Sequence, residues 1–92
     1  MAEKICKHFL VTGRVQGVWF RAGAKKEGER LGLSGWTRNL PDGRVEVMVC
    51  GTMPQLEQME AWLQHGPELA RVDQLQQELL PPKEFDGFMI IG

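Results

Sequence analysis

The stretch LSGWTRNLPDGRVEVMVC, residues 33–50, predicts two strands joined by a tight turn. Pro41 presets φ in this turn and Gly43 supplies a left-handed conformation, a combination typical of a β-hairpin. Apolar and other residues then alternate, which places one set on the core face of the second strand: Val45, Val47 and Val49. The centre of the chain is therefore expected to be a hairpin of residues 33–40 and 44–50.

A helix is predicted on each side of this hairpin. Residues 20–31 carry a stripe of mostly small residues at spacings of four and three, and Gly28 in it would permit close approach to a sheet. After the hairpin, Thr52 and Gln55 resemble a capping box. A second apolar stripe follows and stops at Gly66 and a proline: Leu56, Met59, Trp62 and Leu63.

Strand-like segments complete both ends of the chain, at residues 5–12, 71–80 and 88–91. The order is β-α-β-β-α-β with an extra short C-terminal strand. We expect an α+β, ferredoxin-like sandwich, in which an antiparallel sheet carries both helices on one face. The chain has 92 residues, so residues 1–92 are expected to form a single domain. This architecture serves many functions and does not identify one.

Composition narrows the classes of function. Eleven basic and twelve acidic residues give a net charge of −1, which argues against a nucleic-acid-binding surface. The N-terminus MAEKICKHFL lacks the apolar core of a signal peptide, and no apolar run approaches the length of a membrane span. The sequence therefore predicts a cytoplasmic protein that binds neither nucleic acid nor membrane.

The segment GRVQGVWFR, residues 13–21, lies between the first strand and the first helix. Gly13 and Gly17 allow a curled backbone whose N–H groups converge on an anion, and Arg21 would add a guanidinium at the helix N-terminus. The glycine spacing matches neither a nucleotide-binding P-loop nor a dinucleotide fingerprint. Taken alone, this pattern fits a purely structural turn as well as a phosphate-binding loop.

Two motifs in register resemble the acylphosphatase family, whose members hydrolyse carboxyl-phosphate mixed anhydrides. The first is VTGRVQGVWFR, residues 11–21, and the second is GWTRN, residues 35–39, continued by Asp42, Gly43, Val45 and Gly51. The resemblance covers nearly the whole chain. It implies a ferredoxin-like fold, catalytic Arg21 and Asn39, and a phosphate cradle made by the backbone of Val15, Gln16, Gly17, Val18, Trp19 and Phe20.

The implied reaction converts an acyl phosphate, a small-molecule substrate, to a carboxylate and inorganic phosphate. Its leaving group has a conjugate-acid pKa of about 4 and departs without protonation, so no general acid is needed. Arg21 and the loop amides would hold the phosphate, and Asn39 would orient the attacking water. The interpretation requires no metal, no cofactor and no covalent intermediate, and it predicts a monomer.

The sequence departs from the family pattern at three places. Thr37 stands where a small or branched apolar residue is usual, and Trp19 adds bulk beside the cradle. The ending FMIIG lacks the basic or aromatic ending found in many members, so the resemblance leaves open whether the C-terminus contacts the site.

Other functions have weaker support. RNA-recognition modules share this element order but need aromatic residues on their central strands, and RVEVMVC has none. The more serious alternative is a non-catalytic regulatory domain that keeps the anion cradle.

Cys6 and Cys50 fall opposite each other on the helix-free face if the first and third strands are neighbours. A disulfide is compatible with that placement, although a reducing cytoplasm favours free thiols. His8, Arg38, Trp36, Trp62 and His65 are interpreted as structural or surface residues.

Overall fold

The computed structural model describes residues 3–92. Its elements follow the predicted order: β1 (Ile5–Arg14), α1 (Phe20–Arg30), β2 (Ser34–Asn39), β3 (Val45–Gly51), α2 (Met53–Leu63), β4 (Arg71–Leu80) and β5 (Phe88–Ile90). The largest boundary difference is in β1, which continues past the predicted end at residue 12. It does so through an irregularity between Thr12 and Gly13, where the pairing with β4 shifts register.

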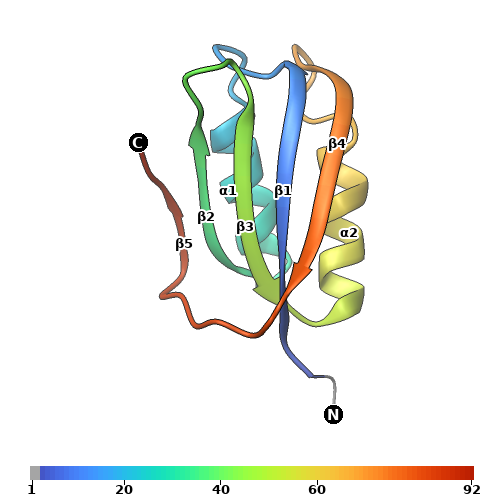
Figure 1. Cartoon of the computed structure of the whole chain (residues 1–92), viewed down its shortest axis with the longest axis vertical. Helices are drawn as coiled ribbons and strands as arrows, with labels where there is room; N and C mark the ends of the chain where they lie inside the picture. The colour runs from blue at the N-terminus through green and yellow to red at the C-terminus, as the bar shows by residue number, and fades with distance from the viewer. Residues whose placement is uncertain (1–2) are drawn as a thin grey trace.

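The sheet has the order β4-β1-β3-β2-β5 (Figure 1). The four longer strands pair antiparallel, as predicted. The short β5 instead pairs parallel to β2, so the complete sheet is mixed. This parallel pairing follows from the route of the chain, because residues 81–87 cross from β4 to the opposite edge of the sheet at the end where β2 begins (Figure 1).

Both helices cover the same face of the sheet (Figure 1). The main core forms there, and the three valines of β3 are fully buried in it, as predicted. Leu56, Met59 and Leu63 of α2 are also fully buried. Gly28 of α1 lies against Phe88 of β5, where an added Cβ would come within 2.6 Å of the ring. The predicted close approach at Gly28 is confirmed, and it fixes β5 beside the first helix.

The opposite face carries a second, smaller apolar cluster made of Cys6, Met48 and Cys50, against which Trp36 and Phe85 pack. Cys6 and Cys50 are direct cross-strand partners and are joined by a disulfide. The predicted proximity is confirmed, whereas the expectation of free thiols is not met in this structure.

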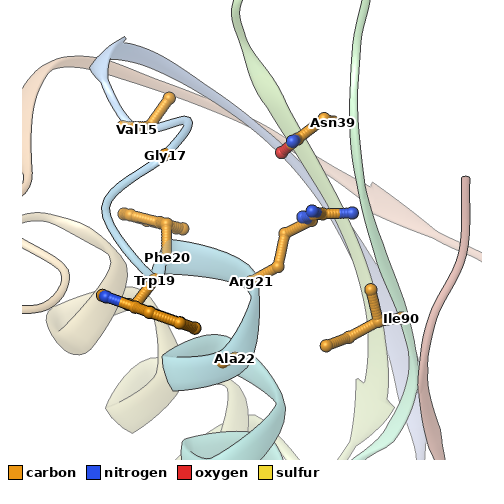
Figure 2. A pocket seen from close by; sticks show the side chains of 8 residues that line it. All are labelled: Val15, Gly17, Trp19, Phe20, Arg21, Ala22, Asn39 and Ile90. Atoms are coloured by element: carbon orange, nitrogen blue, oxygen red, sulfur yellow. The ribbon is translucent and has the colours of Figure 1, made fainter.

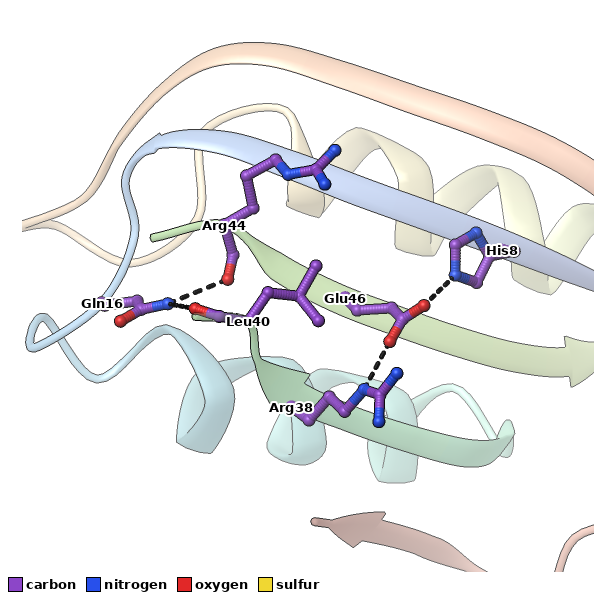
Figure 3. Close-up of polar contacts among 6 residues, drawn as sticks. All are labelled: His8, Gln16, Arg38, Leu40, Arg44 and Glu46. Atoms are coloured by element: carbon purple, nitrogen blue, oxygen red, sulfur yellow. Dashed lines mark hydrogen bonds and ion pairs between the residues drawn. The ribbon is translucent and has the colours of Figure 1, made fainter. Parts of the chain in front are cut away.

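Charged residues on the same face pair with one another. Glu46 of β3 accepts a hydrogen bond from Arg38 and lies 2.6 Å from Nε2 of His8 (Figure 3). Burial opposes ionisation of Glu46, but its bonds to His8 and Arg38 prevail and lower its pKa. Within residues 3–92, no helix is long and apolar enough to cross a membrane.

Candidate active site

A cleft of about 400 Å³ opens where the loop after β1 meets the start of α1, the end of β2 and β5. Its lining residues come from these four segments: Val15, Gly17, Trp19, Phe20, Arg21, Ala22, Asn39 and Ile90 (Figure 2). The two residues predicted to be catalytic, 18 positions apart in the sequence, therefore share one cleft with most of the predicted loop.

The loop turns sharply at two residues with left-handed backbone conformation. Gly17 has φ 72°, and Trp19, the N-cap of α1, has φ 66°. Left-handed residues at alternate positions curl successive N–H groups toward one side of the chain, as in an anion-binding nest. The sequence predicted this role for Gly13 and Gly17, but Gly13 belongs to β1 at the register shift, and Trp19 takes the second left-handed position.

The backbone donors of the loop are open to a ligand. Within the described residues, the N–H groups of residues 16–20 make no hydrogen bond to another protein group. These groups adjoin the N-terminus of α1, whose first turn contains no acidic residue. The helix dipole therefore adds a positive potential that no nearby carboxylate of that turn neutralises. This combination favours an anion with several acceptor oxygens.

Arg21 places its guanidinium in the cleft from the first turn of α1 (Figure 2). The residue is half-buried and forms no ion pair or hydrogen bond within residues 3–92. Arg30 in the last turn of the same helix, by contrast, makes two hydrogen bonds to Glu27. The fork of donors on Arg21 is therefore available to phosphate oxygens.

Asn39 is the last residue of β2, and its carboxamide reaches the cleft from the side of the sheet (Figure 2). Its Oδ1 atom is buried but accepts no hydrogen bond from the described part of the chain. Buried polar atoms are nearly always satisfied, so an unpartnered acceptor beside an unpaired cation points to a bound molecule that donates to it.

Two residues of the predicted loop turn their side chains elsewhere. Gln16 donates from Nε2 to the carbonyl oxygens of Leu40 at 2.8 Å and Arg44 at 3.0 Å (Figure 3). Val18 is buried in the main core. Both side chains fix the loop, one to the hairpin between β2 and β3 and the other to the main core. Their predicted contribution to phosphate binding is through the backbone N–H groups, which these side-chain contacts do not involve.

Sequence reasoning missed Ala22 and Ile90 as lining residues. Ala22 follows Arg21 on α1, and a helix period alone gives no signal for it. Ile90 reaches the cleft because β5 pairs parallel to β2, with Ile90 opposite Thr37. The resemblance leaves open whether the C-terminal ending contacts the site, and Ile90 does line the cleft. Among residues 3–92, no group of three His, Cys, Asp or Glu side chains is arranged to hold a metal ion.

Comparisons with known proteins agree with this geometry. The family model for acylphosphatase matches residues 7–90. An acylphosphatase of Legionella pneumophila strain Paris is 52% identical over 91 residues, covering 99% of this chain and 100% of the relative. The solved acylphosphatase of Coxiella burnetii has a TM-score of 0.92 at 35% identity, with 96% of this chain and 93% of that chain covered. The Bacillus subtilis acylphosphatase also has a TM-score of 0.92, at 29% identity, with 96% and 99% covered.

Proposed function

The chain belongs to the acylphosphatase family, and we propose that Arg21, Asn39 and the backbone of residues 15–20 are the groups that perform its hydrolysis of acyl phosphates. The enzyme cleaves the mixed anhydride between a carboxylic acid and phosphate. The site must therefore hold a phosphoryl group, bring water to phosphorus and let a carboxylate depart.

The phosphoryl group lies against the loop in this proposal. The open N–H groups of residues 16–20 bind its oxygens, and the helix N-terminus stabilises its negative charge. Arg21 binds two oxygens with its fork. Charge on the transferred group is spread over three equatorial oxygens in the transition state, so donors fixed in advance stabilise that state without rearranging.

Asn39 positions the attacking water, and its unpartnered Oδ1 atom is the observation that carries the proposal. A water molecule donates one hydrogen bond to this oxygen and directs a lone pair at phosphorus. Asn39 stands at the end of β2, whereas the phosphate donors stand on the loop and α1, so water and phosphate are held from different elements. This separation favours approach of water from the side facing the sheet.

The bonds formed and broken in this reaction balance without an acid or a base from the protein. The water oxygen forms a new P–O bond while the bond between phosphorus and the acyl oxygen breaks, and the electron pair leaves on the carboxylate. The proton of the attacking water passes to a phosphate oxygen, giving inorganic phosphate. With a conjugate-acid pKa of about 4, the carboxylate needs no proton to leave.

Steady-state hydrolysis of benzoyl phosphate by the wild type and by Arg21→Ala and Asn39→Ala tests these roles. We expect Arg21→Ala to raise KM and lower kcat, and Asn39→Ala to lower kcat by about 10²–10³ with little change in KM. Arg30→Ala is the matched control, because Arg30 lies on the same helix but pairs with Glu27. Full activity in Asn39→Ala, or equal losses in Arg21→Ala and Arg30→Ala, would refute the assignment.

Three further expectations from the sequence remain predictions: a monomer, a reaction independent of metal, and a cytoplasmic location. Sedimentation of the purified chain, activity in the presence of EDTA, and cell fractionation test them in turn.

A further inference from the structure

The cleft extends beyond the groups that would bind phosphate. At about 400 Å³ it falls in the range of pockets that enclose whole small molecules, ~300–1,000 Å³, and a phosphoryl group alone would leave much of it empty. Its remaining wall is apolar; Phe20 is buried, and the large exposed side chains are Trp19 and Ile90. Figure 2 shows these two on opposite sides of the start of α1, below the polar ends of Arg21 and Asn39.

Trp19 is exposed to an unusual degree for a tryptophan, with 76% of its surface accessible. Its backbone is also left-handed, and it is the only such residue other than glycine within residues 3–92. A side chain in this conformation costs about 1–2 kcal/mol, which a glycine would avoid. Trp19 therefore exposes a large apolar side chain at the cleft, although its backbone conformation favours glycine.

Ile90 is 41% exposed and is held in place by its strand. Phe88, two residues earlier, packs on Gly28, and the N–H of Ile91 donates to the carbonyl of Thr37 at 2.9 Å. The two apolar side chains therefore stand on anchored backbone, one at a helix N-terminus and one on a paired strand. Little conformational entropy would be lost when a ligand packs against them.

We propose that Trp19 and Ile90 form an acyl-binding wall that makes the enzyme selective for acyl phosphates with bulky, uncharged apolar acyl groups. This inference rests on the proposed function, because the phosphate position fixes where the acyl group projects. Arg21 is the single charged residue among the lining residues of the cleft, and the phosphate occupies it. An acyl group bearing a second carboxylate would lose hydration without gaining a partner. An aromatic ring would instead stack on the indole and displace water from both side chains.

The test compares kcat/KM for benzoyl phosphate with kcat/KM for acetyl phosphate in each protein. The ratio is taken within each variant, so differences in the intrinsic reactivity of the substrates cancel between proteins. Trp19→Ala is expected to lower the benzoyl-to-acetyl ratio by about five- to tenfold, and Ile90→Ala by about threefold. Trp19→Phe should restore most of the ratio because it keeps an aromatic face.

Leu79→Ala is the matched control. Leu79 is an exposed apolar residue, 56% accessible, and it pairs with Lys7 near the end of the sheet away from the cleft. Its ratio should equal that of the wild type. A ratio within twofold of wild type in Trp19→Ala would overturn the acyl-binding wall, as would an equal change in Leu79→Ala.

A binding experiment separates failure of this inference from failure of the proposed function. Benzylphosphonate and methylphosphonate cannot be hydrolysed and differ only in the apolar group. Calorimetry should show tighter binding of benzylphosphonate to the wild type, and Trp19→Ala should lose that preference while still binding both. If Arg21→Ala binds both as well as the wild type does, the phosphate assignment fails. If the wild type binds both phosphonates equally, only the acyl-binding wall is refuted.

Discussion

The polar side chains of the cleft differ from the paired cations elsewhere on the surface in having no protein partner. Outside the cleft, the cations Lys7, Arg30, Arg38, Arg44 and Arg71 each pair with a carboxylate. Inside it, Arg21 has no such partner within residues 3–92, and Oδ1 of Asn39 has no donor. Similar residue types thus serve two purposes, and what distinguishes the cleft is that an unpaired cation and an unpartnered acceptor line the same pocket.

This difference has an energetic meaning. A paired surface cation adds about 0–1 kcal/mol to stability, and a buried acceptor without a donor costs about 1–3 kcal/mol. An unpaired Arg21 therefore gives up at most a small stabilisation, whereas the acceptor of Asn39 needs a donor from solvent or from a ligand. In our proposal an anion binds Arg21 and the attacking water donates to Asn39, so these two groups stabilise the bound state rather than the fold.

The largest expected effect comes from charging the unpartnered acceptor. Asn39→Asp keeps the shape of the side chain but sets a carboxylate beside the phosphate. Electrostatic repulsion should then lower kcat/KM by about 10³ at neutral pH. Activity should partly recover as the pH falls and the new carboxyl takes up a proton. The measurement is the pH profile of benzoyl phosphate hydrolysis.

The same variant distinguishes two ways of activating water. A carboxylate is a better base than a carboxamide, so Asn39→Asp would be faster than the wild type if the reaction needed a protein base. A rate increase would contradict the proposal that a phosphate oxygen takes the proton.

A smaller effect is expected where a polar side chain of the loop already has its partners. Gln16 ties the loop to the hairpin through Leu40 and Arg44. Gln16→Ala removes both hydrogen bonds and frees the loop, so inhibition by inorganic phosphate should weaken by about tenfold. Competitive inhibition constants for phosphate measure this. Unchanged phosphate inhibition would show that the loop is held by its own backbone and by Val18.

Sequence patterns predicted the elements well because hydrophobic periodicity and turn chemistry act locally. The alternation of valines in β3 and the capping box at Thr52 are local signals, and both features are present. The parallel pairing of β5 was not predictable in this way, since three residues carry too little periodicity to specify a partner strand. Ile90 was missed in the cleft for the same reason.

Local sequence patterns also do not predict the backbone conformation of the loop between β1 and α1. Glycine is the usual sign of a positive φ, and Gly13 and Gly17 do have positive φ, at 140° and 72°. A tryptophan at φ 66° contradicts that preference and depends on the surrounding structure. Likewise, the opposing positions of Cys6 and Cys50 follow from strand order, whereas the disulfide bond between them does not.

The ion pair between Lys7 and Glu60 lies outside the cleft. Glu60 of α2 accepts a hydrogen bond at 2.9 Å from Lys7, whose side chain is only 10% exposed. Lys7, with a smaller contribution from Gln77, lowers the pKa of Glu60 below its usual value of 4.5. A lowered pKa stabilises the folded chain above about pH 4.5, and this stability is lost as the pH falls through the lowered value.

Glu60→Gln should therefore reduce the free energy of unfolding by about 1–2 kcal/mol at neutral pH, because Lys7 loses its counter-charge. The difference from the wild type should shrink as the wild-type carboxyl is protonated in acid. Urea denaturation across this range measures it, with Glu57→Gln as the control, since Glu57 is exposed on the same helix. Equal losses in both variants would contradict the role of the pair. Hydrolysis should be unchanged because Lys7 and Glu60 lie outside the cleft.

The smallest effect concerns the second unpartnered oxygen of β2. Thr37 lies two residues before Asn39 on the same face of the strand, and its Oγ1 also lacks a partner within the described residues. Asn39 lines the cleft, however, whereas Thr37 is fully buried and does not. A ligand in the cleft can therefore contact the side chain of Asn39 but not that of Thr37.

Thr37→Val replaces this hydroxyl with a methyl group of similar size. The variant should gain roughly 1 kcal/mol in free energy of unfolding, because an unsatisfied buried hydroxyl is removed and apolar surface is added. Urea denaturation measures the gain, and benzoyl phosphate hydrolysis measures any change at the site. A loss of stability would mean that Oγ1 has a hydrogen-bond partner in solution, and the two oxygens of β2 would then no longer differ in the way proposed.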